Sequence, residues 1–357
     1  MTKPTTLIEV ARIAGVSTAT VNRVLKGVGY VSADTRARIE AAIKTTRYRP
    51  NALARELRKQ RSMTIGHVVS AITANPFFAS VARGAEDVAL ESGFRTLLFN
   101  HNGSAERERQ GIERFIERRV DAVLFTVAAS RADVTMLIEE KIPVVQVERA
   151  ATRDAPSVTV DNAVGALEAM RHFITLGHRR IALVGGDPDQ VYYGDPLMRA
   201  VEDERLGAYR AGLAAGGLSW NPNYERLGQY YRHEDGAGVQ GYTHMRALLA
   251  GAEPPTAVFA TCDILAAGVL QAIYEAGLRV PDDISVIGFD DTLAINLAPR
   301  LTTVAQPMEE LGREGFKLAL AQIEGDAEPR SIRLPSRLVR RDSAGPVPSA
   351  TTRRKRA

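Results

Sequence analysis

From about residue 63 the chain alternates short apolar segments with amphipathic segments of helical period, and this alternation restricts the possible folds more than any other feature. Strands that alternate with helices along a chain form a parallel sheet covered by helices. The rhythm runs to about residue 161 and then begins again, which predicts two doubly wound α/β lobes in tandem. The expected strands are TIGHVVS, FRTLLFN, DAVLFTV, PVVQVE and SVTVD in the first run and RRIALVGG, AVFATCD and ISVIGFDD in the second, followed by a helix near 308–324 and a strand over 331–339.

Polar side chains follow several of these strands directly. In open α/β sheets the ligand crevice lies beyond the carboxyl ends of the strands. Two lobes whose strand ends face each other therefore indicate a cleft that closes on a polar small molecule. The residues at these strand ends are Asn75, Arg149, Asp161, Asp263 and Asp290.

The N-terminal segment TLIEVARIAGVSTATVNRVLKG (6–27) has a different pattern, that of two short helices joined by a tight turn. Apolar residues from Leu7 to Ala14 recur at i, i+3, i+4 and i+7, Gly15 suits the end of that helix, and Ser17 suits the start of the next. The second helix buries Val21, Val24 and Leu25, and a third is expected from Ser32 to about Thr46. The outward face of the second helix carries Thr18, Ala19, Asn22, Arg23 and Lys26.

Two interpretations of this segment are open from the pattern. A helix–turn–helix places such a polar face in the major groove, where Arg pairs with guanine and Asn with adenine. A two-helix corner of an ordinary bundle simply exposes the same charges to solvent. Charge favours DNA, because residues 1–62 hold thirteen Lys/Arg and four Asp/Glu, a net +9, whereas the rest of the chain sums to −5. A basic head on a mildly acidic body is typical of phosphate binding.

Composition narrows the classes of protein to which this chain can belong. No apolar run approaches the length of a membrane span, and MTKPTTLIEV lacks the apolar core of a signal peptide. Cys262 is the only cysteine, so no intrachain disulfide forms and a cytoplasmic location is expected. The six histidines are scattered without metal-ligand spacing, and neither a metal nor a cofactor is expected.

Several motifs resemble those of the LacI/GalR family of transcriptional regulators over about residues 5–341. They are TLIEVARIAGVSTATVNRVLKG, YRPNALARELR, VTVDNAVGA, LGHRRIALVGG, ERLGAYRAGL, LRVPDDISVIGFDD and LTTVAQPMEELG. The resemblance implies an all-α helix–turn–helix headpiece, a hinge helix and a two-lobed effector domain like that of periplasmic sugar-binding proteins. It also implies a homodimer that reads a pseudo-palindromic operator. No leucine heptads follow Arg341, so a dimer is expected rather than a tetramer.

By resemblance, the groove-facing positions are Thr18, Ala19, Asn22 and Arg23, and Asn22 departs from the more usual Ser. Leu57 matches a leucine wedge that opens the central base step, a device by which apolar side chains kink DNA; the alternative is packing of the hinge onto the core. The full set of expected DNA contacts is Thr6, Ser17, Thr18, Ala19, Thr20, Asn22, Arg23, Lys26, Asn51, Ala54 and Leu57.

The resemblance also implies an effector site, made of Asn75, Phe77, Phe78, Arg149, Asp161, Arg205 and Asp263. Carboxylates that accept hydroxyl hydrogen bonds, an arginine fork and an aromatic ring suit a sugar or similar polyol. Each residue also has a structural alternative: a surface position for Arg205, a helix cap for Asp263 and core packing for Phe78. Three features depart from the family pattern: Cys262, the long segment 187–203 and Gln229-Tyr230-Tyr231. Because Arg149 is positively charged and lies at a strand end, the effector could also be an acid or a phosphorylated sugar.

The expected domains are a headpiece (1–48), a hinge helix or linker (49–62), an effector domain (63–341) and a disordered basic tail (342–357). Within the effector domain the first lobe is expected over about 63–161 and 292–322, and the second over about 162–291 and 323–341.

The expected function is that of a dimeric repressor of carbohydrate uptake or catabolism genes, released from its operator by a sugar-like effector. Alternatives are a corepressor-type or activating regulator that responds to a sugar acid, a sugar phosphate or a nucleobase, and a sugar sensor without DNA function. A more distant one is a dinucleotide-binding enzyme, suggested by the GxGxxG sequence at 236–241. That motif lacks a suitably placed acidic partner, and no catalytic signature accompanies it, so no enzyme is expected.

Overall fold

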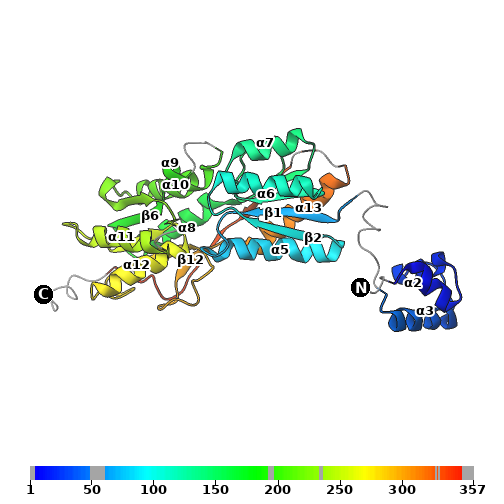
Figure 1. Ribbon diagram of the computed structural model, residues 1–357. Coiled ribbons are helices and arrows are strands. Elements are labelled where there is room, and N and C mark those ends of the chain that lie inside the picture. The colour runs from blue at the N-terminus through cyan, green and yellow to red at the C-terminus, as the bar shows by residue number, and fades with distance from the viewer. Residues whose placement is uncertain are drawn as a thin grey trace. The chain divides into compact units, whose positions relative to one another are not determined.

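In the computed structural model the described residues are 5–48, 61–191, 197–232, 236–325, 328 and 330–347. They fall into two units that divide between Ser62 and Met63. The first unit holds three helices, and the second holds two six-stranded sheets with helices on their faces (Figure 1). Of the predicted DNA contacts, Asn51, Ala54 and Leu57 lie outside the described residues, as does most of the predicted hinge.

The described residues of the first unit form α1 (Leu7–Ala14), α2 (Thr18–Lys26) and α3 (Ala33–Thr46). Each helix is capped at its N-terminus by a side-chain hydroxyl, which belongs to Thr6, Ser17 and Ser32 respectively. Each hydroxyl accepts a hydrogen bond from the backbone amide three residues further along the chain. Such a cap stabilises a helix by about 1 kcal/mol. Gly15 takes φ +66° at the end of α1, a conformation that glycine adopts at little cost. The predicted helix–turn–helix and third helix are therefore confirmed.

The small core of this unit is made by the inward faces of its three helices. It comprises the buried residues Val10, Ala11, Ala14, Val21, Ile39 and Ala42, with Leu7, Val16, Val24, Leu25, Ile43 and Tyr48 packed around them. The residues predicted to face inward do so, and this leaves the polar face of α2 at the surface.

The first lobe of the second unit contains a fully parallel sheet in the order β13-β5-β4-β3-β1-β2. Two pairs of helices cover its faces, α5 with α13 on one and α6 with α7 on the other (Figure 1). The strands are β1 (Thr64–Val69), β2 (Arg95–Asn100), β3 (Ala122–Thr126), β4 (Val144–Val147), β5 (Ser157–Asp161) and β13 (Ser331–Pro335); the helices are α5 (Pro76–Ser92), α6 (Ala105–Glu117), α7 (Arg131–Glu139) and α13 (Met308–Ile323).

The second lobe contains a sheet in the order β14-β12-β11-β10-β6-β7, parallel except for β14. Helices α8 and α10 cover one face, and α11 and α12 cover the other. The strands are β6 (Ile181–Gly186), β7 (Glu225–Gly228), β10 (Ala257–Ala260), β11 (Ser285–Asp290), β12 (Thr302–Ala305) and β14 (Arg337–Val339); the helices are α8 (Asn162–Thr175), α10 (Ala200–Ala215), α11 (Val239–Leu249) and α12 (Asp263–Glu275). Shorter elements are α9 (Pro188–Val191), a 3₁₀ turn (Pro222–Tyr224) and a ribbon of β8 (Tyr231–Arg232) with β9 (Gly236–Ala237).

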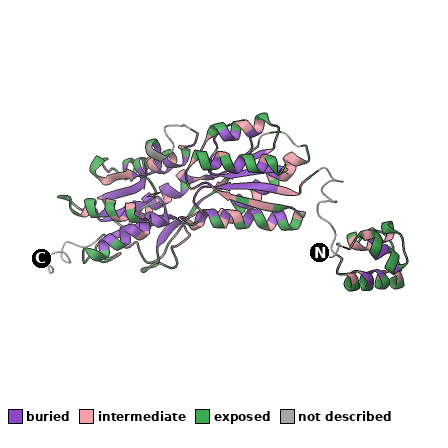
Figure 2. Cartoon of the chain, viewed as in Figure 1, coloured by how far each residue is buried: buried purple, intermediate pink, exposed green. Residues whose placement is uncertain are grey.

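In both lobes the inner strands are buried, edge strands such as β2 and β13 are partly exposed, and the outer faces of the helices are exposed (Figure 2). This is the pattern that the long apolar strands predicted, because a parallel sheet covered on both faces has no solvent side. The predicted fold class, two doubly wound sheets behind a helical headpiece, is confirmed.

The crossings between the lobes differ from the predicted ranges. Residues 302–305 were expected in the first lobe, but β12 pairs with β11 in the second sheet. Residues 331–339 were expected as one strand of the second lobe, but β13 pairs with β5 in the first sheet and β14 with β12 in the second. The break falls at Ser336, whose hydroxyl donates to the Asp161 carbonyl (2.5 Å) and accepts from the Gly165 amide (3.1 Å). The segment predicted as one strand therefore supplies a strand to each of the two sheets.

The GxGxxG sequence at 236–241 is explained by helix packing. Gly238 precedes α11 with φ +89°, and a Cβ on Gly241 would collide with the carbonyl of Leu265 in α12. The facing glycine, Gly268, is held equally close to the carbonyl of Gly238. These glycines permit close approach of α11 and α12.

The chain after residue 341 is ordered further than predicted. Ser343 is fully buried, its hydroxyl donates to the Val286 carbonyl (2.7 Å), and the Gly345 amide donates to Ser285 (3.0 Å). The Gly345 carbonyl also lies 2.9 Å from Nε2 of His178. Residues 342–347 thus pack against the second lobe, which corrects the prediction of disorder there; residues 348–357 lie outside the described part.

Candidate functional site

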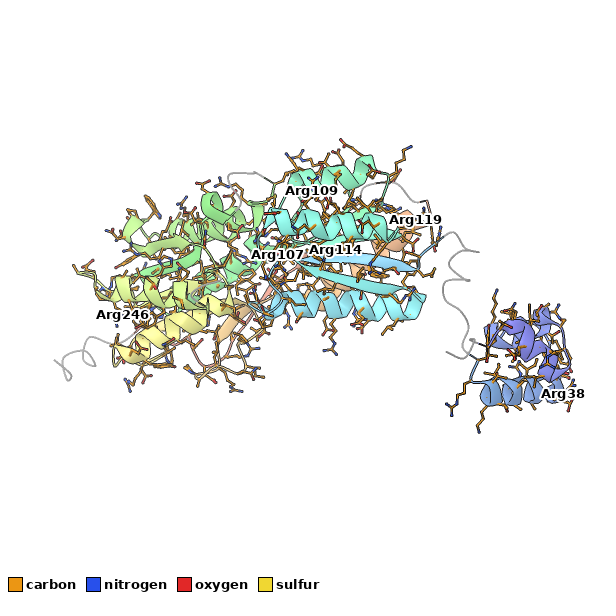
Figure 3. All side chains as sticks on the ribbon, in the orientation of Figure 1. Arg38, Arg107, Arg109, Arg114, Arg119 and Arg246 are labelled. Atoms are coloured by element: carbon orange, nitrogen blue, oxygen red, sulfur yellow. The ribbon has the colours of Figure 1, made fainter. Side chains whose placement is uncertain are left out.

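The outward face of α2 presents the side chains expected to contact DNA. Thr18, Ala19, Arg23 and Lys26 are exposed, and Asn22 is half-buried. Arginine side chains such as Arg38 also project from the surface of this unit (Figure 3), and the only ion pair shown for Arg38 is an exposed one to Asp34 (3.3 Å). The face therefore combines amide, guanidinium and ammonium donors, the groups that read bases and neutralise phosphates.

Thr6 and Ser17 already have local roles as helix caps. Thr6 Oγ1 accepts from the Glu9 amide (3.3 Å), and Ser17 Oγ accepts from the Thr20 amide (3.2 Å). Ser17 and Thr20 also share a hydroxyl–hydroxyl hydrogen bond of 2.9 Å. Both caps are exposed. An exposed helix N-terminus favours an anion such as a phosphate, so these positions suit backbone contacts to DNA.

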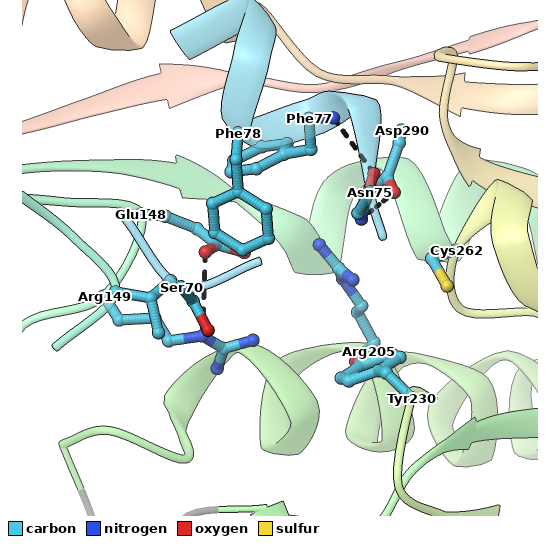
Figure 4. Close-up of a pocket in the computed structure, with 11 residues that line it drawn as sticks. Ser70, Asn75, Phe77, Phe78, Glu148, Arg149, Arg205, Tyr230, Cys262 and Asp290 are labelled. Atoms are coloured by element: carbon cyan, nitrogen blue, oxygen red, sulfur yellow. Dashed lines mark hydrogen bonds and ion pairs between the residues drawn. The ribbon is translucent and has the colours of Figure 1, made fainter. Parts of the chain in front are cut away.

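A cavity lies between the two lobes of the second unit, at the carboxyl ends of the strands. It encloses about 420 Å³, including space open to solvent. Figure 4 shows that its lining comes from both lobes. The first lobe contributes Ser70, Asn75, Phe77, Phe78, Val127, Glu148 and Arg149, and the second contributes Arg205, Tyr230, Cys262 and Asp290.

Arg205 on α10 points its guanidinium into this cavity (Figure 4). Its Nε donates to Asn162 (3.0 Å), its Nη1 donates to the Thr261 carbonyl (2.8 Å), and the group lies 3.9 Å from the centre of the Phe289 ring. Nη2 is buried and has no hydrogen-bond partner. A buried charged donor without an acceptor is costly, so this atom is a candidate donor to a ligand placed in the cavity.

Asp290 is the principal acceptor on the second-lobe side. Its carboxylate accepts from Gln306 Nε2 (2.7 Å) and from Nδ2 of Asn75 (3.4 Å), which comes from the first lobe. Burial raises its pKa to about 7, against the opposing influence of Arg205. Asn75 also caps α5 through the Phe77 amide (3.0 Å), so one side chain fixes the helix start and touches the opposite lobe.

A second arginine, Arg149, forms a buried ion pair that also joins the lobes. Its Nη1 and Nη2 donate to the two carboxylate oxygens of Glu202 on α10, at 2.6 and 2.8 Å. Nη1 also donates to the Met198 carbonyl (3.0 Å), and Nε lies 3.7 Å from Glu148. Burial raises the pKa of Glu148, while Arg149 lowers it.

Aromatic rings cover the remaining walls. Phe77 and Phe78 meet edge to face, with ring centres 5.5 Å apart. The Tyr230 hydroxyl is buried without a hydrogen-bond partner, and its ring lies against Gly186, where a Cβ would collide with it. Burial raises the pKa of the Cys262 thiol, so this sulfur is a neutral wall atom rather than a nucleophile.

Two of the predicted effector residues lie outside this set. Asp263 is fully buried, and its carboxylate accepts from Thr303 Oγ1 (2.7 Å) and from the amides of Thr292 (2.7 Å) and Leu293 (3.3 Å). Asp161 caps α8 and pairs with Arg333 at 3.1 Å. Their carboxylates are used in holding loops and the lobe crossing, so the structure does not bring them into the cavity.

The prediction from sequence also missed lining residues. Ser70, Val127 and Glu148 were not singled out, although each follows a strand of the first sheet. Asp290 was noted only as a strand end, and Tyr230 and Cys262 only as departures from a pattern. The position after a parallel strand was the usable signal, and a systematic reading of all such positions finds these residues.

Among the described residues no cluster of His, Cys, Asp and Glu has the arrangement of a metal site. A search of the same residues found no helix long and apolar enough to span a membrane.

Comparison with known proteins gives matches along nearly the whole chain. Residues 6–51 match the model of bacterial regulatory proteins of the lacI family, and residues 170–344 match a periplasmic binding protein-like domain. The ribose operon repressor of Escherichia coli (strain K12) is 35% identical over 344 residues, which cover 95% of this chain and 99% of that protein.

Solved structures that resemble this chain are likewise those of transcriptional regulators. The Lac repressor dimer bound to operator and the anti-inducer ONPF superposes with a TM-score of 0.79 at 27% identity, covering 96% of this chain and 100% of that one. A regulator from Enterococcus faecium with bound ribose has a TM-score of 0.67 at 30% identity, covering 79% of this chain and 99% of that one.

Proposed function

The chain belongs to the LacI family of bacterial regulatory proteins and is a ligand-responsive, DNA-binding transcriptional repressor, and we propose that its effector is a small uncharged sugar bound between the lobes. The ribose operon repressor and the ribose-bound regulator among its relatives make a pentose such as D-ribose the first candidate. The regulated genes are then those of uptake or catabolism of that sugar.

The unpartnered Nη2 of Arg205 is the observation that carries the sugar proposal. It faces a cavity that also holds the Asp290 carboxylate and the Phe77 and Phe78 rings. Sugar hydroxyls donate to a carboxylate and accept from a guanidinium, and the apolar face of a sugar ring packs on an aromatic ring. Each unsatisfied group of the cavity thus has a partner on a sugar.

The charges around the cavity favour an uncharged effector over a sugar acid or phosphate. The basic groups are Arg149 and Arg205, and the acidic groups are Glu148, Glu202 and Asp290, of which burial raises the pKa of Glu148 and Asp290. Glu202 already binds both Nη atoms of Arg149, so an entering anion finds only the Arg205 guanidinium to bind it. Charge complementarity therefore offers an anion little advantage over a neutral sugar.

We propose that the repressor acts as a homodimer in the cytoplasm, with α2 in the major groove of each half-site and Leu57 of each hinge in the minor groove. Effector closure of the lobes then changes the dimer geometry and withdraws the hinges, which releases the operator. A ligand shifts such an equilibrium only by its difference in affinity for the two forms. We therefore propose that the effector induces transcription by lowering the affinity for the operator. A corepressor would instead raise that affinity, which is the opposite sign of the same coupling free energy between the effector site and the DNA site.

No turnover is expected, because the relatives are repressors and the glycine-rich sequence at 236–241 is used in helix packing. The proposed ranges of headpiece (1–48), hinge (49–62) and effector domain (63 onward) follow from the same family membership.

The chemical class of the effector is tested by thermal unfolding of the full chain in the presence of candidate ligands. The candidates are D-ribose, other neutral sugars, D-ribose 5-phosphate, sugar acids and nucleobases. A ligand that binds only the folded state raises the melting temperature as its concentration rises above Kd. We expect neutral pentoses to raise it and nucleobases to leave it unchanged. A shift with nucleobases alone contradicts the proposal.

A further inference from the structure

The segment that leads into α10 reaches across from the second lobe to the first. The helix begins at Ala200 and so includes Glu202 in its first turn. Just before it, Met198 is buried in the apolar cluster of the first lobe, beside residues such as Val68 and Phe125. Two groups close together in the sequence, Met198 and Glu202, thus contact the opposite lobe.

Glu202 forms the polar part of this contact. It offers both carboxylate oxygens to Arg149, at 2.6 and 2.8 Å, and the two side chains are 1% and 4% exposed. A guanidinium with two parallel donors is the group that proteins use to bind carboxylates and phosphates. Here the position of such an anion is taken by a side chain of the protein itself.

The pair lies at the edge of the sugar cavity. Arg149 is one of the lining residues, and Glu202 is near enough to Tyr230 that, after burial, its charge is the next cause of the raised pKa of that hydroxyl. An anionic ligand that approaches Arg149 has to displace Glu202 and leave its carboxylate buried without a partner. A neutral sugar makes no such demand, because it leaves the pair intact.

We propose that Glu202 is a specificity-determining residue of the effector site: it occupies Arg149 as an internal anion and so excludes sugar acids and sugar phosphates. This inference rests on the proposed function, because it concerns the same cavity. It assigns to the first turn of α10 the task of restricting the effector to uncharged sugars.

Isothermal titration of the full chain with D-ribose, D-ribose 5-phosphate and inorganic phosphate tests the proposal. In Glu202→Gln, the amide keeps the shape but removes the carboxylate that binds both Nη atoms of Arg149, while Glu148 stays 3.7 Å from Nε. We expect the affinity for D-ribose 5-phosphate to rise by about 10- to 100-fold, the range expected for a new hydrogen-bonded charge pair. The affinity for D-ribose should stay within about threefold, a change too small to reflect the loss of one hydrogen bond.

Asp203→Asn is the matched control, because Asp203 lies on the same helix and pairs instead with the more exposed Arg199 (2.9 Å). It should leave the affinities for all three probes unchanged. The double variant Arg149→Gln/Glu202→Gln removes both members of the ion pair, so it also serves if Glu202→Gln does not fold; the Glu148 carboxyl, whose pKa burial already raises, then stands without the arginine that lies 3.7 Å away in the wild type. It should show no gain for D-ribose 5-phosphate, because the arginine responsible is absent.

An equal gain in the double variant, or no gain in a folded Glu202→Gln, overturns the assignment of Glu202. A wild-type chain that binds D-ribose 5-phosphate or inorganic phosphate more tightly than any neutral sugar overturns it without any variant. If D-ribose fails to bind but Glu202→Gln still gains phosphate affinity, the assignment of Glu202 is supported and the proposed pentose effector is rejected. The two failures are therefore distinguishable.

Discussion

Replacing Asp290 by asparagine should stabilise the unliganded protein while weakening its response to the effector. Burial raises the pKa of this carboxyl from 3.8 to about 7, so the folded state resists its ionisation. The substitution removes the charge but keeps the shape. Gln306 adapts, because its Oε1 has no hydrogen-bond partner and accepts from the new amide after a flip of the side chain.

The sign and size follow from proton linkage. The raised pKa means that the unfolded chain ionises first, so the wild-type protein loses stability as pH rises from about 4 to about 7 and no more above that. A shift of about 3 pH units at about 1.4 kcal/mol per unit gives a penalty of roughly 4 kcal/mol above pH 7. The advantage of Asp290→Asn should thus grow by roughly 2–3 kcal/mol between pH 5 and pH 8.

Urea denaturation followed by tryptophan fluorescence measures this effect. The only tryptophan, Trp220, follows α10 in the second lobe, so its signal reports on the unit that contains the cavity. The same variant should bind D-ribose more weakly, and its affinity should lose the increase with pH that a titrating carboxylate acceptor gives the wild type. A stability difference that is the same at pH 5 and pH 8 refutes the reasoning.

Four further predictions concern single residues. Arg205→Lys should weaken D-ribose binding by about 10- to 100-fold, since a charged hydrogen bond is lost, but leave DNA affinity unchanged; equal ribose affinity in a titration removes Arg205 from the site. Asp263→Ala should lower the melting temperature, because Thr303 Oγ1 and the amides of Thr292 and Leu293 lose the carboxylate to which they donate. The same variant should keep the Kd for D-ribose within about threefold, and a folded variant that no longer binds D-ribose contradicts this prediction. Asn22→Ala should change the preferred base at one operator position while Lys26→Ala weakens all sequences alike, as read from anisotropy on operator variants; identical profiles for the two variants count against the groove assignment. Leu57→Ala should lower operator affinity much more than affinity for random DNA, and equal losses on both DNAs exclude the wedge.

The layered fold was predictable because the inner parallel strands are buried on both faces and each helix has its own apolar stripe. The strand crossing at Ser336 was not, because the strand-like sequence SIRLPSRLV runs through 331–339 without a break and only the pairing partners divide it between two sheets. In the same way, nothing in local periodicity shows that residues after 341 pack onto His178 and Ser285.

The candidate site was predictable in part for a similar reason. Strand ends and family motifs singled out Asn75, Arg149 and Arg205, which line the cavity. The same signals placed Asp263 there, although backbone amides and Thr303 use its carboxylate elsewhere. The partner of a buried charge is determined by tertiary structure. For this reason Glu202 was identified only from its ion pair with Arg149 in the structure and not from the sequence.

Fluorescence anisotropy of the full chain on an operator selected from a random DNA pool, with and without D-ribose, tests the central claim most directly. A ligand-released repressor should bind the selected site tightly and lose affinity for it by tenfold or more, a coupling within the usual allosteric range. Affinity for unrelated DNA should change little. An operator affinity that D-ribose and other neutral sugars leave unchanged, but that a sugar phosphate or nucleobase alters, contradicts the account.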